Sequence, residues 1–416
     1  MTGTNWAGNL TYGATSLHEP ATVDELREIV ASASRLRPLG SRHSFNRIAD
    51  TDDAQVSVAH LPVVVDIDEQ AREVTVSAGL RYGELVEQLD AAGWALPNLA
   101  SLPHISVAGA IATGTHGSGD RNHSLAAAVA GLRLVTADGE LMDVRRGDPD
   151  FEGMVVSWGV LGVVTAVTLD IVPTFWMQQD LFEHLPWAEV AEHFDEITSS
   201  AYSVSMYTDW SDTGPHQIWT KSRTDAPPVT ELFGAQVATQ ELHPLPGVDP
   251  GATTRQLGLP GPWWDRLPHF RLEFTPSDGD ELQTEYLVAR TDALDAIASV
   301  RALRERLAPI LLVSEIRTIA ADGLWLSPSR GRDSVALHFT WRLDVPAVTA
   351  FLPLLDDALA PFAARPHWGK VFETTPERLL AAYPRLPEFR ALAERLDPDG
   401  VFRNRLTDGW LGRSED

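Results

Sequence analysis

The sequence predicts an α+β protein with two domains, and three observations support this prediction. Its 416 residues exceed the length at which a single hydrophobic core keeps growing. A helical pattern leads into a short strand and then a glycine-containing loop, which is an α+β arrangement. Near residue 173 Trp and Phe become frequent and Pro becomes scattered. We therefore place a first domain at residues 1–175, a second at 176–370 and a C-terminal segment at 371–416.

The first predicted helix covers residues 21–35 and carries its own start signal. Thr22 and Glu25 have the spacing of a capping box, in which each side chain bonds the other's backbone N–H. The apolar residues that follow have the helical period and share one face: Leu26, Ile29, Val30 and Ala33. A short strand at residues 36–39 then leads into a glycine-containing loop.

The remaining elements of the first domain are predicted from alternation and turn signals. Residues 73–77 alternate polar and apolar side chains, as a half-buried strand does. A helix at residues 82–92 ends at Gly93, and a hairpin turns at Asp138-Gly139. Further strand material is expected at residues 56–65, 132–142 and 162–169.

The second domain is predicted to contain several strands and two helices. The strands are expected at residues 203–210, 217–221, 311–319 and 334–342, and the helices at 294–307 and 348–359. Residues 225–262 are rich in Pro and Gly and lack periodicity, so we expect a long loop there. The C-terminal segment is expected to be helical at residues 376–395.

Two loops rich in Gly and Ser are the strongest candidates for a ligand site. They cover residues 38–45 and 101–119, and His43 and His116 lie within them. Glycine lets the backbone approach a ligand closely, and successive backbone N–H groups in such loops form an anion site. This arrangement suits a pyrophosphate in a chain that lacks the Gly-x-Gly-x-x-Gly fingerprint.

Two predicted strands of the second domain each present a pair of polar side chains on one face. On a strand, Glu315 and Arg317 project together, and His338 and Thr340 do the same. For a single Glu-x-Arg, a surface ion pair is the commoner explanation. Two such strands in one domain instead indicate a polar surface of the kind that polyols need, because every hydroxyl both donates and accepts hydrogen bonds.

Composition excludes several classes of function. A net charge of −25 disfavours nucleic acid, anionic membrane and polyanionic substrates, so a neutral small molecule is expected. The absence of Cys excludes disulfides, a thiolate nucleophile and a cysteine-linked cofactor. The 13 His residues show no metal-ligand spacing, so no metal is expected. No signal peptide or membrane span is seen, and a cytoplasmic protein is expected.

Several motifs along the chain resemble those of the vanillyl-alcohol-oxidase-type flavoproteins, and within that family the bacterial alditol (xylitol) oxidases. The motifs are Gly-Ser-Arg-His-Ser-Phe at 40–45, Leu-Pro-His-Ile-Ser-Val-Ala-Gly at 102–109, Gly-Thr-His-Gly at 114–117, and the segments 315–317, 338–340, 367–370 and 396–404. The resemblance implies an FAD-binding domain of the PCMH type with a mixed-sheet substrate domain. It also implies that residues 371–416 return to the FAD-binding domain.

The resemblance further implies a covalent flavin, with FAD bonded through its 8α-methyl group to His43. One departure from the family pattern is Arg42, where a small residue, often Gly, is expected. The other flavin contacts implied by the resemblance are Leu39, Gly40, Ser41, Arg42, Ser44, Phe45, Ser101, Ser106, Gly109, Thr113, Gly114, Thr115, His116, Gly117, Val164 and His367.

For the substrate, the resemblance implies contacts from Ser101, Glu315, Arg317, Thr340 and Lys370. Arg317 and Lys370 are the candidate cations that stabilise a developing alkoxide. Glu315 is expected to orient Arg317 and to accept from a substrate hydroxyl. The group that takes the proton is left open by the sequence, and His338 is one candidate.

These observations favour an FAD-dependent alditol oxidase that converts a terminal primary alcohol of xylitol, sorbitol and similar polyols to the aldose and reduces O2 to H2O2. The alternative is an aldonolactone oxidase or dehydrogenase on the same scaffold. A protein that binds flavin or sugar without turnover is a third possibility, which the intact polar residues disfavour. We expect a monomer whose partners are the polyol and molecular oxygen.

Overall fold

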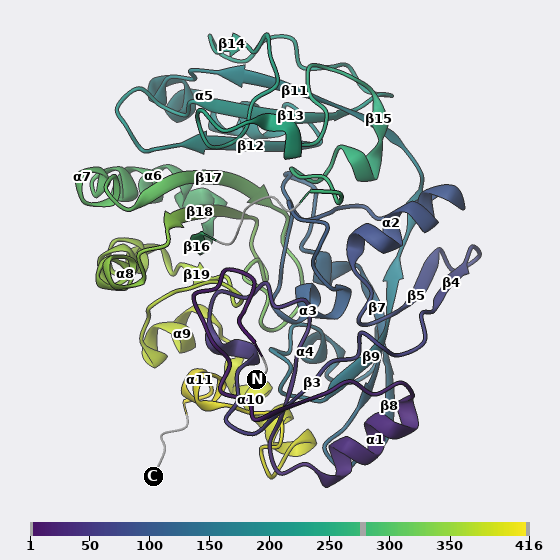
Figure 1. Cartoon of the computed structure of the whole chain (residues 1–416). Helices are drawn as coiled ribbons and strands as arrows, with labels where there is room; N and C mark the ends of the chain where they lie inside the picture. The colour runs from purple at the N-terminus through teal and green to yellow at the C-terminus, as the bar shows by residue number, and fades with distance from the viewer. Residues whose placement is uncertain (1–2, 275–279, 413–416) are drawn as a thin grey trace.

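A computed structural model describes residues 3–274 and 280–412, and it confirms the predicted α+β class with two separate sheet systems (Figure 1). Residues 1–2 and 413–416, at the outer ends of the predicted first domain and C-terminal segment, lie outside the described residues, as do residues 275–279. Within the described residues, five strands in the order β4-β5-β9-β7-β8 form the larger sheet of the N-terminal part. Nine strands form the sheet of the second part. Each sheet has its own apolar core.

The N-terminal part combines its antiparallel sheet with a small parallel sheet in the order β1-β3-β2 and a two-stranded pair β10-β6. Its strands are β1 (Ser16–His18), β2 (Leu36–Pro38), β3 (Ala54–Val56), β4 (Val65–Asp68), β5 (Glu73–Ser77), β6 (Trp94–Ala95), β7 (Val129–Val135), β8 (Leu141–Arg145), β9 (Val163–Asp170) and β10 (Val172–Pro173). Its helices are α1 (Val23–Ser32), α2 (Tyr82–Ala91), α3 (Val107–Ala112) and α4 (Phe151–Val155).

Local signals explain where these elements begin and end. The Thr22 hydroxyl accepts from the Glu25 backbone N–H at 3.1 Å and starts α1, as predicted. Gly139 has φ +80° in the turn that joins β7 to β8, so the predicted hairpin is confirmed. The predicted strand at residues 56–65 is wrong over most of its length. Pro62 has no N–H to donate to a sheet, and the chain turns there before β4.

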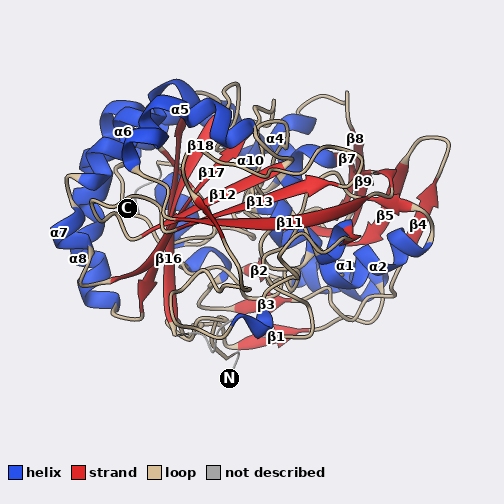
Figure 2. Cartoon of the chain, turned by 90° about the horizontal axis from the view of Figure 1, so that it is seen from above, coloured by secondary structure: helices blue, strands red, loops and turns tan. Residues whose placement is uncertain are grey.

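The second part is built on a sheet with the order β14-β11-β13-β12-β17-β18-β16-β19, with β15 pairing on β11. The pairs of described strands in it are all antiparallel, so the mixed sheet that the resemblance implied for this domain is wrong in this respect. Figure 2 shows helices α5, α6, α7 and α8 gathered along one side of this sheet. Its strands are β11 (Trp176–Glu183), β12 (Ser203–Thr208), β13 (Gln217–Arg223), β14 (Gln236–Val237), β15 (Gly261–Pro262), β16 (Glu281–Ala289), β17 (Leu311–Ile319), β18 (Ser334–Arg342) and β19 (Arg365–Pro366). Its helices are α5 (Trp187–Ser199), α6 (Ala293–Arg301), α7 (Arg304–Leu307) and α8 (Val345–Leu359).

The two strands predicted to present polar pairs, β17 and β18, have the predicted bounds and lie side by side. Phe339 and Trp341 of β18 stack at 5.0 Å on the helix-covered face, which leaves His338 and Thr340 on the other face. The strands β11 and β16 and the helix α5 were not predicted. The segment Val345–Phe362, which begins with α8, is apolar enough to pass a test for a membrane span. Its buried side chains pack into the core of the second part.

The C-terminal segment consists of α9 (Pro376–Ala382), α10 (Leu386–Leu396) and α11 (Arg405–Trp410). The single helix predicted at residues 376–395 is two helices, because Pro384 cannot continue the first one. After α10 the chain lies against the N-terminal part, where the Leu36 N–H donates to the Val401 carbonyl at 2.8 Å. Figure 1 accordingly shows α10 and α11 close to the N-terminal segment.

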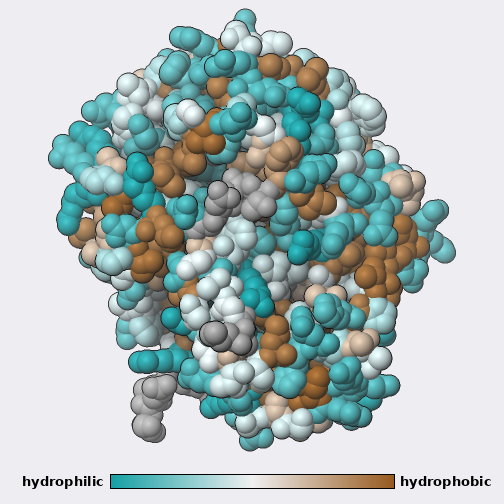
Figure 3. All heavy atoms as spheres, in the orientation of Figure 1, coloured by the Kyte–Doolittle hydropathy of each residue, from teal (hydrophilic) through white to brown (hydrophobic). Residues whose placement is uncertain are grey.

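The face shown in Figure 3 is largely hydrophilic, with apolar groups of limited size between charged ones. Val63 and Val64, which precede β4, are among the exposed large apolar side chains. Isolated apolar side chains of this kind are normal on a protein surface. This surface is what the net charge of −25 leads us to expect.

Candidate active site

A cavity of about 520 Å³ connects the glycine-rich loops of the N-terminal part to the polar face of the second part's sheet. Nearly all the predicted site residues line it. From the loops these are Leu39, Gly40, Ser41, Arg42, His43, Ser44, Phe45, Ser101, Ser106, Gly109, Thr113, Thr115, His116 and Val164, and from the second part Glu315, Arg317, His338, Thr340, His367 and Lys370. Gly114 and Gly117 are not among the lining residues.

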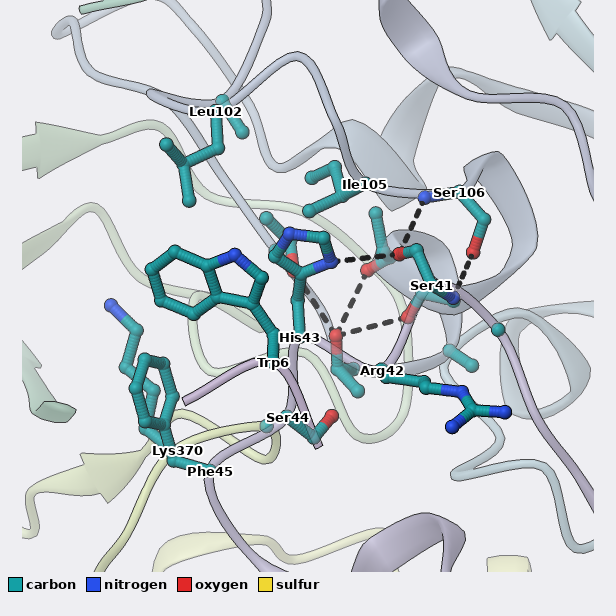
Figure 4. Close-up of a pocket in the computed structure, with 18 of the residues that line it drawn as sticks. Trp6, Ser41, Arg42, His43, Ser44, Phe45, Leu102, Ile105, Ser106 and Lys370 are labelled. Carbon is teal, nitrogen blue, oxygen red and sulfur yellow. Dashed lines mark hydrogen bonds between the residues drawn. The ribbon is translucent and has the colours of Figure 1, made fainter. Parts of the chain in front are cut away.

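His43 lies on the wall of this cavity and is held from two sides (Figure 4). Its Nδ1 is 3.1 Å from the Ser41 hydroxyl, which also accepts from the Ser106 backbone N–H at 3.0 Å. The Trp6 indole stacks on the imidazole with 5.4 Å between ring centroids. Burial, with a smaller contribution from His104, lowers the pKa of His43 to about 4. The imidazole is therefore uncharged at neutral pH, as a nucleophile or a covalent anchor must be.

The two glycine-rich loops pack closely against each other, and at two of their glycines there is no room for a side chain. A Cβ on Gly40 would lie 2.7 Å from the Ser106 hydroxyl, and one on Gly109 would lie 2.8 Å from it. A larger residue at position 40 would press against the second loop, and one at position 109 would displace the Ser106 side chain within that loop. Arg42 has φ +64°, in the left-handed region that favours Gly, which agrees with the small residue expected there from the family pattern.

The register of three neighbouring strands brings the polar side chains of the second part together. Glu315 of β17 is paired with His338 of β18, and His338 is paired with Glu285 of β16. Residues paired across a sheet lie on the same face, so all three side chains point to the cavity. We call this surface the polar wall and define it as Glu285, Glu315, Arg317, His338, Thr340 and Lys370.

Glu285 lies at the centre of the polar wall, and its side chain is completely buried. Arg317 Nη2 approaches Glu285 Oε1 at 2.6 Å, and Lys370 Nζ approaches Oε2 at 2.7 Å. His116 Nε2 from the N-terminal part lies 3.5 Å from the same carboxylate. Burial alone would raise the pKa of Glu285, but Lys370 and Arg317 outweigh it and hold the pKa well below its ordinary value. Glu285 therefore fixes both candidate cations in place.

Lys370 and His338 form a directed hydrogen-bond chain. An ammonium only donates, so His338 Nδ1, 2.7 Å from Lys370 Nζ, is the acceptor. The proton of the neutral ring is then on Nε2, which lies 3.1 Å from the Thr340 hydroxyl oxygen. Burial, followed by the Lys370 charge, lowers the pKa of His338 well below its ordinary value, which agrees with a neutral ring. The Thr340 hydroxyl accepts this bond and keeps its own proton to donate elsewhere.

Arg317 also connects the polar wall to the second glycine-rich loop. Its Nη1 lies 3.4 Å from the Ser101 hydroxyl, and its Nε lies 3.5 Å from Glu315 Oε2. Burial would lower the pKa of Arg317, but Glu315 and Glu285 outweigh it and raise the pKa above its ordinary value. The guanidinium is a permanent cation next to the loop that carries Ser101.

Sequence reasoning missed several residues that line the cavity, namely Trp6, Tyr207, His269, Gln283 and Glu285. A signal for Glu285 was present. Glu281, Gln283 and Glu285 alternate with other residues in the pattern that marked β17 and β18. No local signal would have placed His269, which lies in an irregular segment after the long loop. Among residues 3–274 and 280–412 no three His, Asp or Glu side chains are placed to hold a metal ion.

Comparison with known proteins identifies the family. Residues 15–145 match the family model described as FAD binding domain, and residues 280–413 match the one described as D-arabinono-1,4-lactone oxidase. An alditol oxidase from a Streptomyces strain is 51% identical over 404 residues, covering 96% of this chain and 97% of the relative. This chain belongs to the vanillyl-alcohol-oxidase-type family of FAD-linked oxidases.

Further matches share a smaller part of their sequence with the chain. The L-gulono-1,4-lactone dehydrogenase of Mycobacterium tuberculosis is 31% identical, with 98% of each chain covered. The bovine L-gulonolactone oxidase is 27% identical, with 96% of each covered. The crystal structure of cholesterol oxidase from B. sterolicum matches with a TM-score of 0.80 over 98% of this chain and 96% of that one, at 15% identity. That last likeness establishes the fold only.

FAD is the cofactor of this family, and the residues around the cavity fit it. The close approach of Gly40 and Gly109 forms a cradle of backbone at one end of the cavity, as a pyrophosphate requires. At the other end His116 Nε2 is buried, and its contact with the Glu285 carboxylate at 3.5 Å is too long for a well-formed hydrogen bond. A flavin ring between His43 and the polar wall would offer that nitrogen a polar partner.

Proposed function

We propose that this chain is an FAD-dependent alditol oxidase that oxidises the terminal primary alcohol of an open-chain polyol to the aldose and reduces O2 to H2O2. The observation that carries the proposal is one cavity with His43 on one wall and the polar wall on another. The 51% identity to an alditol oxidase supports the same choice of substrate class. A wall of donors and acceptors rejects analogues that lack hydroxyls, because its own polar groups would be left unpaired.

The bound FAD would accept a hydride from the alcohol carbon at its N5 atom and pass the electrons to oxygen. The task of the polar wall is to bind the polyol and stabilise the negative charge that develops on its terminal oxygen. Lys370 has one N–H donor left after bonding to Glu285 and His338, and we assign it to this oxygen. Arg317 supplies the second cation, and Ser101, Glu315 and Thr340 bind the remaining hydroxyls.

For the proton we propose a route along the Lys370–His338 chain. Lys370 first passes a proton to His338 Nδ1, which is 2.7 Å away, and the lone pair of the resulting amine then takes the alcohol proton. Burial, with Arg317 acting in the same direction, lowers the pKa of Lys370 from its ordinary value, although Glu285 opposes this. A less basic ammonium transfers its proton more readily to the imidazole. His338 then acts as the acceptor that the sequence left open.

We also propose that FAD is attached covalently to His43. The uncharged, stacked imidazole on the cavity wall supports this assignment. The denatured protein should remain yellow on a gel, and His43→Ala should remove the colour. His60→Ala, at an exposed position, is the control that should stay yellow. Release of free FAD from the denatured wild type would contradict the covalent bond and leave the oxidase function untouched.

The deciding experiment is anaerobic mixing of the protein with xylitol and sorbitol while the flavin absorbance is followed. Rapid bleaching by a polyol, and peroxide formation when oxygen is admitted, are the expected results. Faster bleaching by gulono- or galactonolactone would favour the alternative, an aldonolactone oxidase or dehydrogenase. The match of residues 280–413 to a lactone oxidase model is the reason to test this alternative. A protein that no compound bleaches would be a binding protein.

We also propose the domain bounds, the cellular location, the oligomeric state and the absence of macromolecular partners. We place the FAD-binding domain at residues 1–175, the substrate domain at 176–370 and the returning segment at 371–416. The protein is proposed to be a cytoplasmic monomer without nucleic-acid or membrane partners. Its net charge of −25 supports the last point, because both partners carry negative charge.

A further inference from the structure

A buried lysine lies behind the polar wall and takes no part in the chemistry proposed above. Lys221 is in the middle of β13, between β11 and β12, and only 1% of the residue is exposed. Its Nζ is 2.7 Å from the Leu267 carbonyl, 2.8 Å from the Pro268 carbonyl and 3.0 Å from His269 Nδ1. Burial lowers the pKa of Lys221 well below its ordinary value, and the three contacts bond Nζ fully at this buried position.

These contacts fix the proton of the His269 ring. Glu315 Oε1 lies 2.8 Å from His269 Nε2, and a carboxylate can only accept, so Nε2 is the donor and His269 Nδ1 accepts from Lys221 Nζ. The proton of the neutral ring therefore lies on Nε2. Burial, with Lys221 acting in the same direction, lowers the pKa of His269 to about 4 and keeps the ring neutral.

The bond from His269 restricts the orientation of the Glu315 carboxylate. One carboxylate oxygen, Oε1, is occupied by His269 Nε2–H, while the other, Oε2, has Arg317 Nε 3.5 Å away. Glu315 lines the cavity, and only 5% of its surface is exposed, so its side chain can adopt few orientations. Without the bond from His269, the carboxylate would be free to turn both oxygens toward Arg317.

We propose that Lys221 and His269 are positioning residues that hold the Glu315 carboxylate with Oε2 presented to a hydroxyl of the substrate. The proposal rests on the function proposed above and concerns the recognition of the polyol, not the transfer of hydride. The reacting oxygen is assigned to Lys370 and Arg317, which are both held by Glu285 on the neighbouring strand β16. Loss of the Lys221–His269 pair should therefore weaken polyol binding much more than it slows the reduction of bound flavin.

The test compares variants of the FAD-loaded protein in anaerobic stopped-flow with xylitol, which separates the substrate dissociation constant from the limiting rate of flavin reduction. We expect Lys221→Met and His269→Leu each to raise the dissociation constant about 10-fold, as loss of one charged hydrogen bond does. The limiting rate should change less than about 3-fold. His269→Gln should stay close to wild type, because its amide can both accept from Lys221 and donate to Glu315.

The double variant Lys221→Met with Glu315→Gln decides whether the pair acts through Glu315. If it does, Lys221→Met adds nothing to the dissociation constant once the carboxylate is gone. Additive effects, or an unchanged dissociation constant in Lys221→Met, would overturn the inference. If Lys221→Met does not fold, the His269→Leu and His269→Gln pair decides the question. A wild type that xylitol does not reduce would instead refute the proposed function.

Discussion

Lys370 is the residue whose removal should affect the chemical step most. Lys370→Met keeps the length of the side chain but removes every N–H donor, so the charge on the alcohol oxygen loses its nearest cation. We expect the limiting rate of flavin reduction to fall about 10²- to 10³-fold, the range for loss of one donor to a developing oxyanion. Anaerobic stopped-flow with xylitol measures it. An unchanged rate would exclude the assigned role.

The FAD content of Lys370→Met serves as the control for that measurement. The Lys370 side chain is held by Glu285 and His338 and makes no contact with Gly40 or Gly109 among the described residues. The flavin absorbance per protein should therefore equal that of the wild type. A parallel loss of FAD would show that the variant disturbs the fold and not the reaction.

Arg42 should prove to be a strained position whose side chain partly offsets the strain. Its φ of +64° costs a residue with a Cβ about 1–2 kcal/mol relative to Gly. Its guanidinium lies over the Tyr12 ring at 5.9 Å, a contact that Ala and Gly both lack. We therefore expect Arg42→Gly to be more stable than Arg42→Ala by about 1 kcal/mol in urea unfolding. Equal stabilities would show that the loop relaxes around residue 42.

At the scale of the element, one buried arginine joins β2 to the turn before β9 and to the C-terminal segment. The Arg37 guanidinium donates to the carbonyls of Phe402 and Ile48, and to those of Trp158 at 2.8 Å and Gly159 at 3.3 Å. Its planar fork reaches four carbonyls that an ammonium cannot satisfy together. Arg37→Lys should lower the free energy of unfolding by about 2–3 kcal/mol.

Arg35 provides the matched control for that prediction. It is a neighbour on the same stretch of chain, and it donates to one carbonyl only, that of Gly400, from an exposed position. Arg35→Lys should cost less than about 0.5 kcal/mol in the same urea titration. Similar losses in both variants would mean that the buried carbonyls are not what makes Arg37 important.

Elements with a strong local signal could be predicted from the sequence, and their assembly could not. The bounds of β17 and β18 and the polar face of each follow from alternation, which is a property of the strand alone. The position of Glu285 opposite His338 depends on the register of β16, which is set by packing across the sheet. His269 and Lys221 meet only because the chain after the long loop lies over β13. The two glycine-rich loops were recognisable because their Gly and His residues are close in sequence.

At the scale of the whole molecule, the site lies where the N-terminal part and the second part meet. An ion pair outside the cavity also joins the two parts. Arg290, which follows β16, bonds to Asp120 of the N-terminal part at 2.7 Å and to Asp195 of α5 at 2.9 Å. His116 of the N-terminal part reaches Glu285 of the second part. The geometry of the polar wall relative to His43 therefore depends on both parts keeping their relative position.

Buried neutral histidines should make the whole fold sensitive to mild acid. The pKa of His269 is about 4 in the folded protein and 6.5 when exposed, so between these values only the unfolded chain binds a proton there. The free energy of unfolding must then fall as the pH falls from 6.5 toward 4, by on the order of 3 kcal/mol for one such group. His338 and His367, whose pKa values burial also lowers, act in the same direction.

Urea unfolding at a series of pH values between 7 and 4.5 measures this dependence, and His269→Gln isolates one contribution to it. The amide of Gln does not titrate, so the variant should lose less stability than the wild type over that interval. The carboxylates Glu285 and Glu315 do not interfere, because their pKa values are held well below the ordinary value of 4.5 and their contribution is lost only at lower pH. Parallel curves for the two proteins would mean that His269 is already charged in the folded state. The tautomer assigned to it beside Lys221 would then be wrong as well.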